Sequence, residues 1–250
     1  MRILVINPNT SESFTQRIEV TAKKYAHSET EIILRTASSG PRAIESVFDE
    51  VLSCQGTLEV ALRELEKVDG IVIACYSDHP AIAALREVTD IPVIGIAEAN
   101  MYMACLLGNK FSIITTNVEW EPLLWDAVRH YGLTERCSSI QSTGLPVLAL
   151  EAADSTEIYT LIKDAAQKAI SVYGAEVICL GCAGMSGMDK QLENDLKVPV
   201  LDGVVCALKL LEGMIEYGVK TSKQCTYSQP APKELVNLPA SFSRGYQSHK

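Results

Sequence analysis

The sequence predicts an α/β protein of two pseudo-symmetric domains, each a mainly parallel sheet flanked by helices. The first observation is that short apolar segments alternate with segments of helical periodicity, a pattern typical of parallel sheets with helices on both faces. The second is an internal repeat: shifting the chain by 107 residues places Cys75 on Cys182, and residues 91–93 (Ile-Pro-Val) on residues 198–200 (Val-Pro-Val). Ligands bind such sheets at the carboxyl ends of the strands, so we expect the active site in the cleft between the two domains.

The first half shows strands and helices in strict alternation. Its first helix has Thr10 or Ser11 as N-cap and an apolar face of Phe14, Ile18 and Tyr25. The third helix takes Pro80 in its first turn, where proline is tolerated, after Ser77 or Asp78 as cap. Strands are expected at residues 3–6, 31–36, 70–74 and 91–96, with a long helix at residues 47–65.

The second half repeats this plan. Strands are expected at 111–115, near 138–141 and up to Cys182, with helices at 121–131 and 156–173. We expect residues 1–96 plus a closing helix at 207–222 to form the N-terminal domain, and residues 97–206 the C-terminal domain. Residues 223–250 are rich in Pro, Ser and Gln, which predicts an extended or partly disordered tail.

The composition narrows the function classes. The net charge of −9 and the absence of a basic stripe argue against nucleic acid or an anionic membrane as partner. No apolar stretch is long enough to span a bilayer and no signal peptide is evident, so a cytoplasmic location is expected, with the eight cysteines kept as thiols. Walker, Gly-x-Gly-x-x-Gly and Gly-x-Ser-x-Gly motifs are absent at the predicted strand ends.

Cys75 and Cys182 are the candidate catalytic residues, because each ends an apolar strand and the repeat superimposes them. A helix N-terminus follows Cys75, and bare backbone N–H groups follow Cys182, so we expect both pKa values to be lowered toward the thiolate. Two thiols on opposite sides of one cleft suit the removal of a proton from one face of a carbon and its return to the other. That reaction is a racemisation, and it needs neither metal nor organic cofactor.

Other interpretations of these residues were weighed. The other six cysteines (54, 105, 137, 179, 206 and 225) are expected to be small core residues. Cys179 and Cys182 form a CxxC, but Cys179 lies inside the strand and the histidines are dispersed, which disfavours a redox pair or a zinc site. His79 could be a second base, although a helix cap or a solvated side chain is more in keeping with its position.

Small polar loops at the predicted strand ends could hold a neutral polar ligand. They comprise residues 7–10, 38–41, 76–77 and 115–117. The substrate contacts predicted from these loops, and from the resemblance described next, are Asn9, Ser39, Tyr76, Ser77, Thr115, Thr116, Gly181 and Ala183.

Residues 1–223 resemble the hydantoin and allantoin racemases of the aspartate/glutamate racemase superfamily. The resemblance rests on Asn-Pro-Asn-Thr at 7–10, Ala74-Cys75, residues 92–99, Leu-Gly-Cys-Ala-Gly-Met at 180–185, and residues 198–203. It implies two catalytic cysteines, at positions 75 and 182, and substrate contacts from Asn9, Ser77, Thr115, Thr116 and Ala183. It also favours a homo-oligomer.

The same resemblance indicates the substrate class. Amino-acid racemases of this superfamily usually carry an acidic residue in the first loop and a Thr-His pair after the second cysteine, whereas this chain has Asn9 and Ala183-Gly184. A site without countercharges should prefer a neutral ligand, so a 5-substituted hydantoin or allantoin is expected. The alternatives are an aspartate or glutamate racemase, a related isomerase or decarboxylase, and a non-catalytic two-lobed binding protein.

Overall fold

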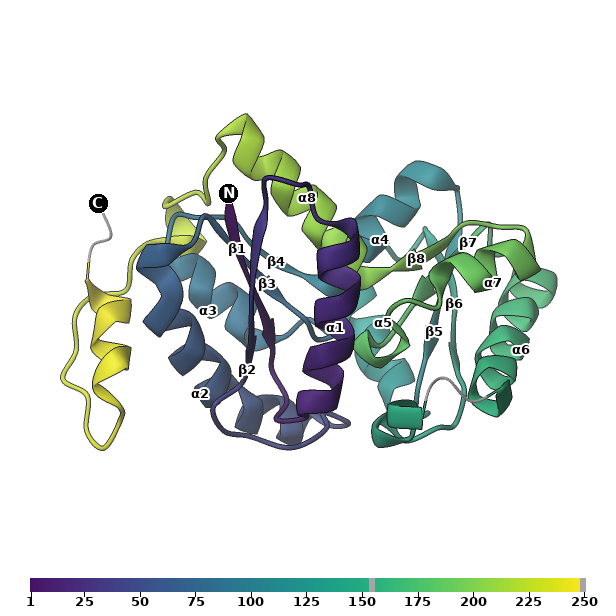
Figure 1. The fold of residues 1–250 in the computed structure, drawn as a ribbon, viewed down its shortest axis with the longest axis horizontal. Helices are drawn as coiled ribbons and strands as arrows, with labels where there is room; N and C mark the ends of the chain where they lie inside the picture. The colour runs from purple at the N-terminus through teal and green to yellow at the C-terminus, as the bar shows by residue number, and fades with distance from the viewer. Residues whose placement is uncertain (153–155, 248–250) are drawn as a thin grey trace.

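The computed structural model describes residues 1–152 and 156–247 and contains two four-stranded sheets (Figure 1). All neighbouring strands pair in parallel, in the equivalent orders β2-β1-β3-β4 and β6-β5-β7-β8. The predicted fold class is therefore confirmed. The strands are β1 (Arg2–Asn7), β2 (Glu31–Thr36), β3 (Gly70–Ile73), β4 (Val93–Gly95), β5 (Phe111–Thr115), β6 (Cys137–Ser142), β7 (Val177–Leu180) and β8 (Val200–Asp202).

Helices flank both sheets. They are α1 (Glu12–Tyr25), α2 (Val47–Glu64), α3 (Pro80–Val88), α4 (Ile96–Leu107), α5 (Trp120–His130), α6 (Thr156–Tyr173), α7 (Asp189–Leu196) and α8 (Gly203–Tyr217). The short 3₁₀ helices are η1 (Leu65–Lys67), η2 (Val147–Ala152), η3 (Ala183–Met185), η4 (Cys225–Tyr227) and η5 (Ala240–Tyr246). Two helices, α4 and α7, have no counterpart among the predicted elements. In α4 the polar Glu98 and Asn100 are buried together with its apolar residues, so the sequence lacks the polar stripe of an amphipathic helix.

The central strands are buried on both faces. Every residue of β3, β5 and β7 is buried, as expected for parallel strands covered by helices on each side. The 107-residue offset carries β3 onto β7 and β4 onto β8 without a shift, whereas the strand registers align β1 with β5 at an offset of 108. The two halves are thus the same structural unit used twice.

The last helix of each half packs on the sheet of the other half. Helix α4 follows β4 but contacts β5 and β7, while α8 follows β8 and contacts β3, β4 and α1. Figure 1 shows α8 over the first half, although its strand belongs to the second. The two helices also pack against each other, and a Cβ on Gly203 would lie only 3.0 Å from the Ile96 carbonyl oxygen. This exchange of closing helices between the two halves holds the two sheets in a fixed relative position, in which the carboxyl ends of their strands face one pocket.

The C-terminal tail follows the surface of the first half. Its 3₁₀ helix η5 packs against α2, and the Arg244 guanidinium donates a hydrogen bond to the Leu62 carbonyl oxygen at 3.2 Å. Figure 1 shows this segment on the side of the molecule away from the second sheet. Among the residues that the structure describes, no helix combines the length and the apolar character needed to cross a membrane.

Candidate active site

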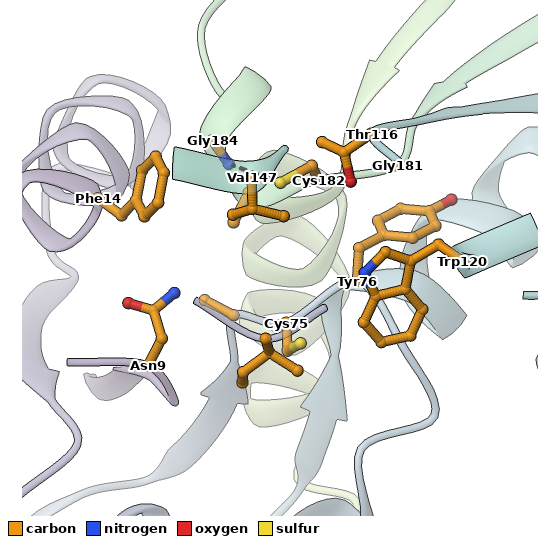
Figure 2. Close-up of a pocket in the computed structure, with 13 residues that line it drawn as sticks. Asn9, Phe14, Cys75, Tyr76, Thr116, Trp120, Val147, Gly181, Cys182 and Gly184 are labelled. Carbon is orange, nitrogen blue, oxygen red and sulfur yellow. Dashed lines mark hydrogen bonds between the residues drawn. The ribbon is translucent and has the colours of Figure 1, made fainter. Parts of the chain in front are cut away.

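A pocket between the two halves is lined by four pairs of residues that the repeat relates. Each pair consists of residues 107 positions apart, and the carboxyl ends of the inner strands supply them. Figure 2 shows Cys75 and Cys182 on opposite sides of this pocket. The pairs are Asn9 with Thr116, Ala74 with Gly181, Cys75 with Cys182, and Tyr76 with Ala183.

The remaining lining residues were not predicted as site residues. They are Phe14, Ile44, Trp120, Val147 and Gly184. In Figure 2, Phe14 lies beside Asn9 at one end of the pocket, and Trp120 lies beside Tyr76 at the other. Phe14 and Trp120 both lie in the first turn of the helix after the first strand of a half. The 107-residue offset places Phe14 on Glu121, so the repeat does not relate them, and their position just after a strand end was the signal that could have found them. Val147 belongs to η2, and no periodicity marked that segment.

The backbone places both cysteines in the same way. The residue before each cysteine extends the sheet hydrogen bonding by one step: the Ala74 N–H donates to Ile6 O at 2.8 Å, and the Gly181 N–H donates to Ile114 O at 2.7 Å. Gly181 is also required by space, because a Cβ there would lie 2.7 Å from the same Ile114 oxygen. Each thiol is therefore fixed directly beyond a strand that is buried on both faces.

Each sulfur accepts one hydrogen bond from the residue two positions later. The Ser77 hydroxyl donates to Cys75 Sγ at 3.4 Å, and the Gly184 backbone N–H donates to Cys182 Sγ at 3.4 Å. Ser77 and Gly184 are themselves related by the repeat. The two thiols thus have equivalent partners of different chemistry, a side-chain hydroxyl and a main-chain amide.

The expectation that both thiol pKa values are lowered was wrong. Burial raises the pKa of Cys182 to about 11, although the Gly184 N–H opposes the rise. Burial raises the pKa of Cys75 still further, and the nearby Glu50 carboxylate adds to this rise while the Ser77 hydroxyl opposes it. At each thiol the loss of hydration outweighs the effect of one hydrogen bond or of a short helix end on the pKa.

Asn9 presents its amide nitrogen to the pocket. Its side-chain Oδ1 accepts hydrogen bonds from the Asn7 Nδ2 and from the Ser11 backbone N–H, both at 2.9 Å. Figure 2 shows the nitrogen end of Asn9 turned toward the pocket. An amide NH₂ held in this way can donate to a carbonyl oxygen of a ligand.

Thr116 and Tyr76 complete the polar lining in different ways. The Thr116 hydroxyl donates to Asn117 Oδ1 at 3.0 Å, which leaves its oxygen able to accept from a ligand N–H. The Tyr76 hydroxyl donates to Asn100 Oδ1 at 3.1 Å, so this hydroxyl is engaged in the core and the ring forms a wall. The wall formed by Tyr76 continues into Trp120 (Figure 2).

Three of the predicted substrate contacts do not line this pocket. Ser39 is exposed, and its backbone lies against Gly56 of α2. Ser77 is buried behind Cys75 and reaches the pocket only through its hydrogen bond to the sulfur. Thr115 is buried at the end of β5, where its carbonyl oxygen accepts from the Thr143 N–H. Thr115 points away from the pocket because successive side chains of a strand point to opposite faces. The positions of Ser39 and Ser77 depend on the conformation of turns, which a sequence pattern does not give.

His79 is the cap of α3, rather than Ser77 or Asp78 as predicted. Its Nδ1 accepts from the Ala81 N–H at 3.2 Å, and its Nε2 lies 2.8 Å from the Ser53 hydroxyl. The Ser53 hydroxyl donates its one proton to the Glu50 carbonyl oxygen, so His79 Nε2 carries the hydrogen of that contact. Burial lowers the pKa of His79 to about 4, which keeps the ring neutral.

The other cysteines differ from the two in the pocket. Cys137, Cys179 and Cys206 are buried and belong to one apolar core, whereas Cys182 packs against another, so Cys179 and Cys182 face different cores. Cys54 and Cys105 are half-buried, and Cys225 is exposed, which corrects its interpretation as a core residue. Within residues 1–152 and 156–247, no group of three or more His, Cys, Asp or Glu side chains is placed to hold a metal ion.

Comparison with known proteins identifies the family. Residues 3–211 match the family model described as Asp/Glu/Hydantoin racemase. A hydantoin racemase from Pseudomonas sp. (strain NS671) is 41% identical over 251 residues, with 100% of both chains covered. Among solved structures, an allantoin racemase from Klebsiella pneumoniae superimposes with a TM-score of 0.91 at 39% identity, covering 95% of this chain and 96% of its own. The allantoin racemase from Pseudomonas fluorescens gives a TM-score of 0.91 at 36% identity, covering 95% of this chain and 100% of its own. The chain therefore belongs to the Asp/Glu/Hydantoin racemase family.

Proposed function

We propose that this protein is a cofactor-independent racemase of a 5-substituted hydantoin or allantoin, with Cys75 and Cys182 as its two bases. The observation that supports this most directly is the position of the two thiols, on opposite sides of one pocket at repeat-related strand ends. The curated relative named hydantoin racemase and the two solved allantoin racemases agree with this substrate class.

In the proposed reaction one cysteine is a thiolate and the other a thiol. The thiolate removes the C5 proton, forming an S–H bond as the C5–H bond breaks, and the electron pair delocalises into the adjacent ring carbonyl. The opposite thiol then delivers its proton to the other face of C5 and becomes a thiolate. After this step the two cysteines have exchanged protonation states. The next turnover therefore runs in the reverse direction, or it follows the transfer of a proton from one sulfur to the other through solvent.

The pocket favours a neutral substrate. None of the described residues that line it has an acidic or basic side chain other than the cysteine and tyrosine groups. A carboxylate or an ammonium group placed there would lose hydration without gaining a countercharge, which costs several kcal/mol, roughly. The amide of Asn9 and the hydroxyl of Thr116 instead match the carbonyl and N–H groups of a cyclic ureide.

The decisive experiment is polarimetry or circular dichroism of single enantiomers. Purified protein with EDTA is mixed separately with allantoin, with 5-substituted hydantoins, and with L- and D-aspartate and glutamate. We expect the optical signal to decay for at least one ureide and to stay constant for the amino acids. Decay with an amino acid alone would mean that the substrate is an amino acid and not a ureide. Constant signals with every compound would favour a binding protein that does not turn over its ligand.

Replacement of either cysteine separates the two half-reactions. We expect Cys75→Ser and Cys182→Ser each to abolish racemisation while retaining exchange of the C5 proton in deuterated water for one enantiomer. The two variants should select opposite hands, because the remaining thiol reaches only one face of the ring. NMR or mass spectrometry of each enantiomer measures the exchange, and exchange of the same hand by both variants would contradict the assignment of faces.

A further inference from the structure

The wall of the pocket contains residues fixed to the sheets and residues carried by connecting segments. The two thiols lie within two residues of the ends of β3 and β7. Ile44 and Val147 come instead from the segment 41–46 before α2 and from the start of η2. Both are buried, each 6% exposed, and they belong to different halves. Connecting segments are the parts of a fold that move most readily, so this side of the wall is the one that can open.

The pocket as it stands is too small for a cyclic ureide. Water-sized spheres can occupy about 40 Å³ of it. That is room for roughly three water molecules, and a hydantoin ring with its carbonyl oxygens and a 5-substituent is larger. The thiols are not free to move apart, because the preceding residues, Ala74 and Gly181, are hydrogen-bonded to neighbouring strands. We therefore expect the segment 41–46 and η2 to separate when a ureide enters.

Glu45 joins these two segments across the halves. Its Oε1 accepts a hydrogen bond from the Val147 N–H, the first amide of η2, at 2.6 Å. The first amides of a helix have no partner within the helix, so a carboxylate is a favoured acceptor for them. Glu45 is itself held in place, because its backbone N–H donates to Asp49 Oδ2 in the first turn of α2 at 3.0 Å. This carboxylate thus connects the neighbour of Ile44 directly to Val147.

The other end of η2 also contacts the first half, through Glu151. Its Oε1 accepts from the Ser13 hydroxyl at 2.9 Å and from the Ser11 hydroxyl at 3.1 Å, and it pairs with Arg42 at 3.2 Å. The Arg42 side chain is 67% exposed, and such surface ion pairs contribute little. Glu45 is only half-buried too, but its bond is a short charge-assisted one to a main-chain amide. We therefore expect Glu45 to contribute more than Glu151 to holding the segments together.

Leu150 keeps η2 attached to its own half. This side chain is fully buried, and a Cβ on Gly184 would lie only 2.9 Å from Leu150 Cδ1. The Gly184 N–H in turn donates to Cys182 Sγ. One part of η2 therefore lies against the turn of Cys182, while its first residue is held by the first half.

We propose that the segment 41–46 and η2 form a gate over the two thiols, and that Glu45 is the positioning residue that keeps this gate closed in the free protein through the Val147 N–H. The gate opens when this hydrogen bond breaks and Ile44 parts from Val147, which gives a ureide access to both sulfurs. The inference rests on the proposed function for the identity of the substrate. It adds a residue that controls entry and takes no part in the proton transfer.

The test is the rate of thiol alkylation in the full-length protein. N-ethylmaleimide is a suitable probe because it is a five-membered cyclic imide, similar in shape to a hydantoin, and peptide mass spectrometry follows each cysteine separately. In Glu45→Ala we expect Cys75 and Cys182 both to react roughly tenfold faster, because the open gate is more populated once a hydrogen bond to a charged group is lost. Cys225, which is exposed, is the internal reference and should react at an unchanged rate.

Two further variants separate the gate from other effects. Glu45→Gln keeps an acceptor oxygen for the Val147 N–H, so it should accelerate the two thiols by less than about threefold. Glu176→Ala is the matched control, because the Glu176 carboxylate accepts from the Asn109 N–H, also at 2.6 Å, before the amino ends of β5 and β7. Its loss should leave the alkylation of both pocket thiols unchanged.

An electrostatic effect of Glu45 has a different signature. Its charge contributes to the raised pKa of Cys182, so removal of the charge alone would accelerate Cys182 and not Cys75, and equally in Glu45→Gln and Glu45→Ala. That pattern, or no acceleration in Glu45→Ala, would overturn the gate.

Hydrogen exchange supplies a second measurement that does not depend on thiol chemistry. The amide of Val147 should exchange faster in Glu45→Ala than in the unmodified protein and in Glu176→Ala, since opening breaks its hydrogen bond. An unchanged exchange rate would contradict the role of Glu45. Neither measurement uses a substrate, so these failures are distinguishable from a failure to racemise ureides, and thermal melts show whether each variant is folded.

Discussion

At the scale of single residues, the protonation of a side chain depends more on the groups that surround it in space than on its position along a strand or helix. The positions of Cys75 and Cys182 at strand ends could be predicted from the repeat, but the direction of their pKa shifts could not. Burial depends on the residues that close the pocket from other elements, such as Val147 and Trp120. Those residues are distant in sequence from the cysteines, so local rules about helix ends predicted the wrong direction for the pKa shifts.

His79 provides a residue-scale prediction for stability. Its folded pKa of about 4 lies below the ordinary histidine pKa of 6.5, so the unfolded chain binds the proton more readily. His79 therefore stabilises the fold fully above about pH 6.5, and this contribution is lost as the pH falls toward 4. The loss amounts to about 3 kcal/mol, as an order of magnitude. Urea denaturation between pH 7 and pH 4 should show a shallower decline for His79→Asn, which keeps a capping side chain. An equal decline in both proteins would rule out this role for His79.

At the scale of elements, the turn that carries Cys182 depends on Gly181. We expect Gly181→Ala to shift this turn, because the new Cβ would meet the Ile114 carbonyl oxygen and the Ile113 side chain, each at 2.7 Å. Racemisation should fall by at least about tenfold and stability by roughly 1–3 kcal/mol. Kinetic assays and urea denaturation measure the two effects.

The matched control for this change is Gly213→Ala on the exposed face of α8. A Cβ at Gly213 meets no atom within 4 Å, so this variant should keep full activity and gain up to about 1 kcal/mol from helix propensity. Full activity of Gly181→Ala would mean that the turn tolerates the shift and that its backbone does not fix the thiol.

Element boundaries illustrate what sequence patterns can and cannot supply. The strand at 31–36 and the helix at 156–173 were predicted at their observed limits, because each has a clear periodicity and flanking polar residues. The strand expected at 91–96 ends at Gly95, since Ile96 already begins α4. An apolar strand that runs directly into an apolar helix gives no change of pattern, and for this reason α4 was missed.

At the scale of the whole molecule, the helix exchange ties the two halves into one unit. Asn100 of α4 accepts from the Tyr76 hydroxyl of the first half and donates to the Leu201 carbonyl oxygen of the second, at 3.1 Å in each case. Glu151 of η2, in the second half, accepts hydrogen bonds from Ser11 and Ser13 of the first half, and it pairs with Arg42. The repeat predicted two similar halves, and the helix at 207–222 was expected to close the first domain, but α4, which makes the reciprocal contact with the second sheet, was not predicted.

This coupling predicts that the protein unfolds in a single cooperative step. Both tryptophans of the chain, Trp120 and Trp125, lie in α5, so tryptophan fluorescence reports on the second half, whereas far-ultraviolet circular dichroism reports on all helices. We expect the two signals to change at the same urea concentration, because neither half keeps a covered sheet once the other has lost its helix. An independent second half would instead lose its fluorescence signal while part of the dichroism remained. Two separate transitions would mean that the exchanged helices can leave one sheet without exposing the other.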